Sequence, residues 1–237
     1  SANISYRSTA YVDLDNINFG LSDQVGKDSY NNKFTIGDVS AEAKYTFRQE
    51  TTKIDESNRA GASVTEHTVT KTENMLKWAI VMDLSDNYST MTITDTLPAG
   101  LTIQEIYIGG EYNSDKYERS NGFSTPINLW NDYMKGNVQS IIVDEQAGRP
   151  TSIAVNLAVT DGNRSEYFTN GAKLWVFVHA TVDEDQFDTV SQTTVSYTNH
   201  VSVTGDGEPL GEDDQTQNTT LDAESIAKTV INTNNNW

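Results

Sequence analysis

Three polar residues stand inside runs that otherwise alternate apolar and polar side chains, as β-strands do. They are Lys71 in TVTKTENMLKW, Asp95 in TMTITDTLPAGLTI and Asn199 in TTVSYTNHVSV. Burial in an apolar sheet favours the neutral forms of an amine and a carboxyl group. A neutral amine is a nucleophile, and a carboxylic acid can polarise an amide carbonyl and pass a proton to departing ammonia. The three residues therefore predict a Lys71–Asn199 isopeptide bond, with Asp95 as the proton shuttle.

The elements that must position these residues are strands. Runs with a period of two are rich in Val, Ile, Thr, Tyr and Trp and are bounded by clusters of Gly, Asn, Asp and Ser. One stretch, Pro126–Gly136, has the Pro and Gly boundaries of a short helix. The pattern predicts an all-β protein, an antiparallel β-sandwich of Ig-like type with at most one short helix. The strand-like runs are Ile4–Leu14, Lys77–Leu84, Ser152–Val159, Lys173–Val182 and Thr193–Val203.

The sequence also resembles itself at a distance of roughly 160 residues, which is the signature of tandem repeats. The alignment places Asn32 on Asn199 and Lys71 on Lys228. Repeats that each fold around their own sheets would form an extended rod. The clearest matching segments are Ser29–Asp38 with Ser196–Asp206, and Thr68–Trp78 with Ser225–Trp237.

These matches predict three parts of the chain. Residues 1–60 are expected to be the closing strands of a preceding repeat or an N-terminal β extension. Residues 61–222 are expected to form one complete β-sandwich repeat. Residues 223–237 are expected to open a following repeat or to form a C-terminal strand, so that adjacent repeats of the same protein are partners.

Three segments resemble the collagen-adhesin-type and fimbrial isopeptide domains of Gram-positive surface proteins. They are WAIVM at 78–82, ITDTLPAGL at 93–101 and YTNHVSV at 197–203. The resemblance covers the two ends of the expected repeat and leaves residues 110–170 unmatched. It implies a collagen-adhesin-like sandwich that needs no cofactor. It also implies a cell-adhesion role on the bacterial surface, with anchoring to the cell wall through regions outside this chain.

The resemblance further implies a bond between a first-strand lysine and a last-strand asparagine, assisted by an acidic residue. Lys71, Asn199 and Asp95 take these roles. Lys53, in TTKIDESNRAGA, is the alternative lysine, since the short interval from Lys71 to Trp78 places Lys71 near a strand end. The equivalent residues of flanking repeats are Asn32 and Lys228. A host matrix protein or a glycan is the expected partner, of open identity.

Bulk composition narrows the classes of partner. The chain has 34 acidic and 16 basic residues and a formal net charge of −18. Phosphate backbones and anionic membranes attract clusters of Lys and Arg, so this balance disfavours both nucleic acid and a membrane as partners. Cysteine is absent, so no disulfide can reinforce the fold. The chain also has no apolar run long enough to cross a bilayer.

A second interpretation is a carbohydrate- or peptide-binding module without a cross-link. Aromatic residues gather in the Gly- and Asn-rich region 107–133, where they can form a binding surface. They can equally plug the open end of a sandwich. The candidate ligand-binding residues are Tyr112, Tyr117, Trp130 and Tyr133.

Enzymatic turnover and metal binding find less support in the sequence. Neither G-x-S-x-G nor H-E-x-x-H is present, so no enzyme is expected beyond a self-catalysed, single-turnover cross-link. Three oxygen-rich stretches could suit calcium, but none has EF-hand spacing, and we interpret them as solvated loops. These stretches are Asp13–Asn16, Asp183–Asp188 and Gly205–Asp214.

Overall fold

The protein is an all-β sandwich, as the sequence predicts. The computed structural model describes residues 29–36, 39–46, 51–60, 63–84, 88–127, 137–160, 172–187 and 192–222, with only the backbone described for 29–46. Helix within these residues is limited to short 3₁₀ segments: η3 (Glu56–Asn58), η4 (Arg119–Asn121) and η5 (Glu184–Phe187). Most of the expected helix at Pro126–Gly136 lies outside the described residues. The strands are β1 (Ser29–Ile36), β2 (Val39–Thr46), β3 (Thr51–Asp55), β4 (Glu66–Thr70), β5 (Met75–Asp83), β6 (Thr90–Thr96), β7 (Leu101–Gly109), β8 (Ser114–Glu118), β9 (Val138–Gln146), β10 (Arg149–Ala158), β11 (Lys173–Val182), β12 (Thr193–Gly205) and β13 (Glu208–Asp222).

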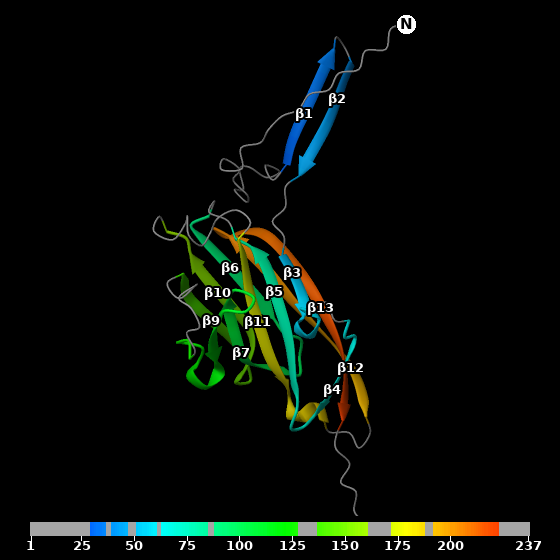
Figure 1. Cartoon of the computed structure of the whole chain (residues 1–237), viewed down its shortest axis with the longest axis vertical. Helices are drawn as coiled ribbons and strands as arrows, with labels where there is room; N and C mark the ends of the chain where they lie inside the picture. The colour runs from blue at the N-terminus through cyan, green and yellow to red at the C-terminus, as the bar shows by residue number, and fades with distance from the viewer. Residues whose placement is uncertain are drawn as a thin grey trace, which may run out of the picture.

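Two sheets form the sandwich (Figure 1). One sheet has six strands in the order β4-β13-β12-β6-β10-β9, and the other has five in the order β3-β5-β11-β7-β8. The pairing of β13 with β4 is parallel, and the other described pairings are antiparallel. The β1–β2 hairpin makes a separate two-stranded sheet, drawn at the top of Figure 1.

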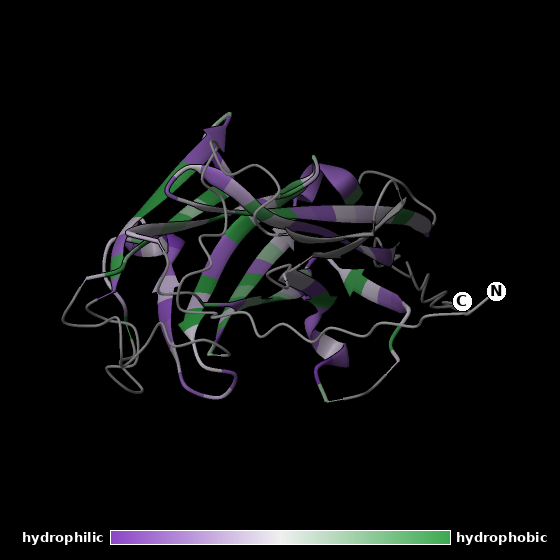
Figure 2. Cartoon of the chain, turned by 90° about the horizontal axis from the view of Figure 1, so that it is seen from above, coloured by the Kyte–Doolittle hydropathy of each residue, from purple (hydrophilic) through white to green (hydrophobic). Residues whose placement is uncertain are grey.

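The core lies between the two sheets because side chains alternate between opposite faces of each strand. In β6, Met91, Ile93 and Asp95 are buried, while the residues between them are partly exposed. Figure 2 shows this alternation as hydrophobic and hydrophilic bands along the strands. β6 lies in the middle of its sheet, between β10 and β12, so Asp95 points into the centre of the apolar interior.

The sandwich includes a strand that precedes residue 61. β3 pairs antiparallel with β5, with Lys53 opposite Ile80 and Asp55 opposite Trp78. The described sandwich therefore begins at or before Thr51, ten residues ahead of the boundary that the repeat pattern predicts. The division of the chain into repeats stays a prediction, and residues 223–237 lie outside the described part.

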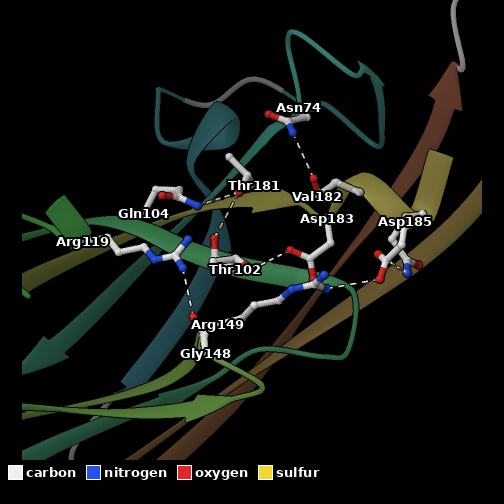
Figure 3. A network of polar contacts seen from close by, with 11 residues as sticks. Asn74, Thr102, Gln104, Arg119, Gly148, Arg149, Thr181, Val182, Asp183 and Asp185 are labelled. Carbon is white, nitrogen blue, oxygen red and sulfur yellow. Dashed lines mark hydrogen bonds and ion pairs between the residues drawn. The ribbon is translucent and has the colours of Figure 1, made fainter.

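One end of the sandwich is held by a network of polar contacts (Figure 3). Arg149 Nη1, where β10 begins, donates to Asp183 Oδ2 at 2.8 Å and to Asp185 Oδ2 at 3.3 Å. Thr102 Oγ1 of β7 donates to Asp183 Oδ1 at 2.5 Å. Both carboxyl oxygens of Asp183 are thus engaged by protein donors, which supports a structural role for the start of the Asp183–Asp188 stretch.

Candidate functional site

Asp95 is a carboxyl group at the centre of an apolar core. It is 0% exposed, and its neighbours in the sheet are Ile153 of β10 and Val201 of β12. A buried carboxyl without partners costs several kcal/mol, so such a group is stable only with hydrogen-bonding or charged partners. Asp95 has two partners in the core, and both are residues singled out in the sequence.

The first partner is Lys53. Its Nζ contacts Asp95 Oδ1 in a buried ion pair, and the residue is 2% exposed. Its alkyl stem crosses the core from β3, a strand of the opposite sheet. Burial lowers the pKa of Lys53, while the charge of Asp95 and its hydrogen bond act to raise it. The net direction is downward, toward a neutral and nucleophilic amine.

The second partner is Asn199 in β12. The residue is 0% exposed, and its Nδ2 donates to Asp95 Oδ2 at 3.1 Å. Its carbonyl Oδ1 is buried and has no hydrogen-bond partner. Asp95 therefore bridges the lysine through one carboxyl oxygen and the asparagine through the other. One acidic group contacts both a potential nucleophile and a potential electrophile.

Lys71 lies elsewhere. It follows the last residue of β4 and is exposed in the turn that leads to β5, a turn closed by the hydrogen bond from Thr70 N to Glu73 O at 3.1 Å. Its side chain therefore lies outside the apolar core that holds Asp95. The preference for Lys71 over Lys53 is therefore corrected, and Lys53 is the lysine that the fold brings to Asp95.

Further contacts hold β3 against the sheet that carries Asp95. The backbone N–H of Lys53 donates to Asp213 Oδ2 of β13 at 2.6 Å. Two residues on, the buried carboxyl of Asp55 contacts His67 Nε2 and accepts from Ser57 N at 2.9 Å. The positions of Lys53 and Asp55, two apart on a strand, are a sequence signal that both side chains share one face, although hydropathy would assign that face to the surface. Asp213 and His67 had no such signal, because their role depends on pairing between distant strands.

Of the remaining candidate residues, the two whose side chains the structure describes, Tyr112 and Tyr117, differ in exposure and do not share a site. Tyr112 is 76% exposed, whereas Tyr117 is 4% exposed and packs in the core. Trp130, Tyr133 and Lys228 lie outside the described residues. Asn32 lies on β1, where only the backbone is described.

In the described ranges, no group of three or more His, Asp or Glu side chains is arranged to hold a metal ion. In the same ranges, no helix is both long and apolar enough to cross a membrane.

The chain is similar to known proteins in structure but not in sequence. No protein-family model matches the chain, and no curated protein matches it in sequence. The collagen-binding subdomain of the Enterococcus faecalis surface protein ACE is 10% identical, with a TM-score of 0.34 over 67% of this chain and 97% of that one.

Two further structures come from streptococci. The C-terminal domain of the Streptococcus pyogenes antigen I/II-family protein AspA is 11% identical, with a TM-score of 0.45 over 76% of this chain and 49% of that one. The pilus backbone RrgB of Streptococcus pneumoniae is 15% identical, with a TM-score of 0.38 over 68% of this chain and 33% of that one. The chain thus spans half or less of these two proteins. It is similar in structure to domains of Gram-positive surface proteins, and identities this low show likeness of fold alone.

Proposed function

We propose that this chain is a domain of a bacterial cell-surface adhesin or pilus-like stalk, stabilised by an isopeptide bond between Lys53 and Asn199. The observation that carries the proposal is the bridge through Asp95, which contacts both side chains inside a dry core. Asp95 is the proton shuttle. The reaction occurs once per molecule, so the protein is not an enzyme that turns over.

The first step is a proton transfer within the Lys53–Asp95 contact. Passing one proton from the ammonium to the carboxylate leaves a neutral amine and a carboxylic acid, both of which low dielectric favours over the ions. The amine then has a free electron pair. It needs only a small movement toward the Asn199 side chain, because both groups already contact the same carboxyl.

The second step exchanges one amide for another. Lys53 Nζ attacks Cγ of Asn199, the new C–N bond forms, and the bond from Cγ to Nδ2 breaks. Asp95 donates its proton to the departing nitrogen and receives one from Lys53 Nζ, so ammonia leaves and the carboxyl is regenerated. Rotation of the Asn199 amide would turn its unpartnered Oδ1 toward the acid, which would polarise the carbonyl before attack.

The product would tie the two sheets of the sandwich together. Lys53 and Asn199 are roughly 146 residues apart in sequence. If the chain-entropy relation for disulfides applies, closing such a loop stabilises the fold by about 5 kcal/mol through the unfolded state. The tie also joins the first strand of the described sandwich, β3, to the hairpin that ends it, β12–β13. Such a covalent tie suits a stalk that transmits tension between a surface and a bound host molecule.

Intact-mass measurement tests the proposal directly. Loss of one ammonia lowers the mass by about 17 Da relative to the sequence. We expect this deficit in the wild type and its absence in Lys53→Met, Asp95→Ala and Asn199→Ala. Lys71→Met is the matched control, because it removes an exposed lysine and should retain the deficit. A wild type at its full calculated mass would overturn the proposal.

A further inference from the structure

A hollow of about 360 Å³ lies on the outer face of the five-stranded sheet. Val176 and Val178 of β11 belong to the core, so the alternate residues Phe177 and His179 face outward into the hollow. Lys53 points from β3 into the core. The hollow is therefore separate from the site around Asp95 and lies on the other side of the sheet.

Aromatic rings form the floor and rim of the hollow. On the floor, the Tyr107 ring lies edge-on to Phe177, with centroids 6.4 Å apart, and 4.9 Å from the ring of His179. At the rim, Tyr112 is 76% exposed. The Arg59 guanidinium lies between rim and floor, 5.2 Å from the Tyr112 ring centroid and 5.3 Å from that of Phe177. Burial of a large apolar ring on an outward face, together with an exposed ring beside it, is typical of a ligand surface.

Hydrogen-bonding groups of both kinds surround these rings. Arg59 donates from Nη1 to the backbone carbonyl of Glu111 at 3.0 Å. The Glu56 carboxylate contacts His179 Nε2 at 2.6 Å. Burial acts to raise the pKa of Glu56, but the hydrogen bond and charge of His179 oppose it, and the net direction is downward. The wall thus offers N–H donors and carboxylate acceptors side by side.

The mixture of charges favours a particular class of ligand. A simple anion would meet Glu56 and Glu111 in a chain of net charge −18, and a simple cation would meet Arg59 and Lys116. A pyranose ring has hydroxyl groups that both donate and accept, and an apolar face of C–H groups that packs on aromatic rings. The hollow lies over the face of the sheet and reaches Ser114 and Lys116 of the edge strand β8. The backbone carbonyl of Lys116 already accepts a hydrogen bond from Ile127 N at 2.7 Å, so it is not free to pair with an added peptide strand.

We propose that this hollow binds a sugar ring of a glycan, with Tyr112 packed against the ring and Arg59 and Glu56 bonded to its hydroxyl groups. The volume lies in the range of small-ligand sites. A neutral hexose and a carboxylate-bearing sugar share this recognition. They differ in whether Arg59 meets a hydroxyl group or a carboxylate.

The test is binding of the full chain to immobilised oligosaccharides in two panels, followed by titration calorimetry of the best ligand. One panel ends in neutral glucose, galactose or N-acetylglucosamine, and the other ends in uronic or sialic acids. We expect Tyr112→Ala to weaken binding about tenfold or more and Tyr112→Trp to retain it. Arg59→Ala should weaken binding in both panels, and more strongly if the ligand carries a carboxylate.

Ile142→Ala is the matched control, since Ile142 is an exposed apolar residue on β9, a strand of the other sheet, and does not line the hollow. It should bind as the wild type does. Absence of binding in both panels would overturn the proposal. So would glycan binding that Tyr112→Ala and Arg59→Ala leave unchanged, or binding that only peptides show.

Discussion

Replacing Lys53 by Met tests both the bond and its energetic role. Methionine has nearly the length of the lysine stem but carries no amine, so the cross-link cannot form. The loss then has two parts. Losing the covalent loop costs about 5 kcal/mol, and leaving the buried Asp95 carboxyl without its partner from Lys53 costs about 1–3 kcal/mol more. A loss of this size approaches the whole stability of an ordinary domain, so the single variant is expected to unfold easily.

A triple variant separates the two parts. Lys53→Met/Asp95→Leu/Asn199→Leu removes every polar partner together, and replacing paired buried polar groups by apolar groups of similar shape can be nearly neutral. The expected loss against the wild type is then the loop term alone, about 5 kcal/mol, which corresponds to about 10–20 °C in Tm.

Guanidinium unfolding, with intact mass measured on each sample, is the assay. Lys71→Met serves as the control and should retain both the mass deficit and the unfolding midpoint of the wild type. A triple variant as stable as the wild type would show that no covalent loop contributes to stability. A mass deficit that persists in Lys53→Met would show that another lysine forms the bond.

Three further predictions follow from neighbouring contacts. Asn199→Ala cannot cross-link, and burial then lowers the folded-state pKa of Lys53 below its unfolded value of 10.5. The unfolded state therefore binds more protons, so the free energy of unfolding should rise with pH up to about 10.5. Denaturant midpoints measured from pH 7 to 10 should show this slope, and adding Lys53→Met should reduce it. In single-molecule pulling, the cross-linked sandwich should release only the roughly 23 residues beyond Asn199, about 80 Å of chain. Lys53→Met should release several hundred ångströms. Equal released chain lengths in the two proteins would contradict the bond. Gly205→Ala places a methyl group 2.6 Å from the buried Tyr88 ring, and this overpacking should lower the free energy of unfolding by about 1–3 kcal/mol. An unchanged thermal midpoint would contradict the expected clash.

Much of the architecture could be predicted from local pattern. Alternation in β6 and β12 places Asp95 and Asn199 in phase with buried residues on the same strand, such as Ile93 and Val201. The alternation of inward and outward positions depends only on neighbouring residues in one strand, so it can be predicted from the sequence alone. The prediction that these two side chains face one core needed no knowledge of which strands pair.

The choice of lysine could not be made in this way. Lys71 is in phase with the buried Val69, but β4 ends at Thr70, so the chain turns before the lysine can point inward. Lys53 lies on a strand of only five residues whose inward positions are Lys53 and Asp55, a pattern that hydropathy assigns to a surface. Partners on distant strands, Asp95 and His67, make that burial possible. These partners are distant in the sequence, so a local pattern of residues cannot identify them.

The same dependence on distant partners sets the order of folding and reaction. Asp95 contacts Lys53 and Asn199 only when β3 pairs with β5, β6 pairs with β12, and the two sheets face each other. Before reaction the buried ion pair and the unpartnered Asn199 carbonyl each cost stability. The proposed amide exchange would remove the ammonium permanently and release ammonia, so the reaction would relieve a cost that native packing itself created. A bond formed in this way can join only correctly folded sheets, because a misfolded chain would not bring the three groups together or exclude water from them.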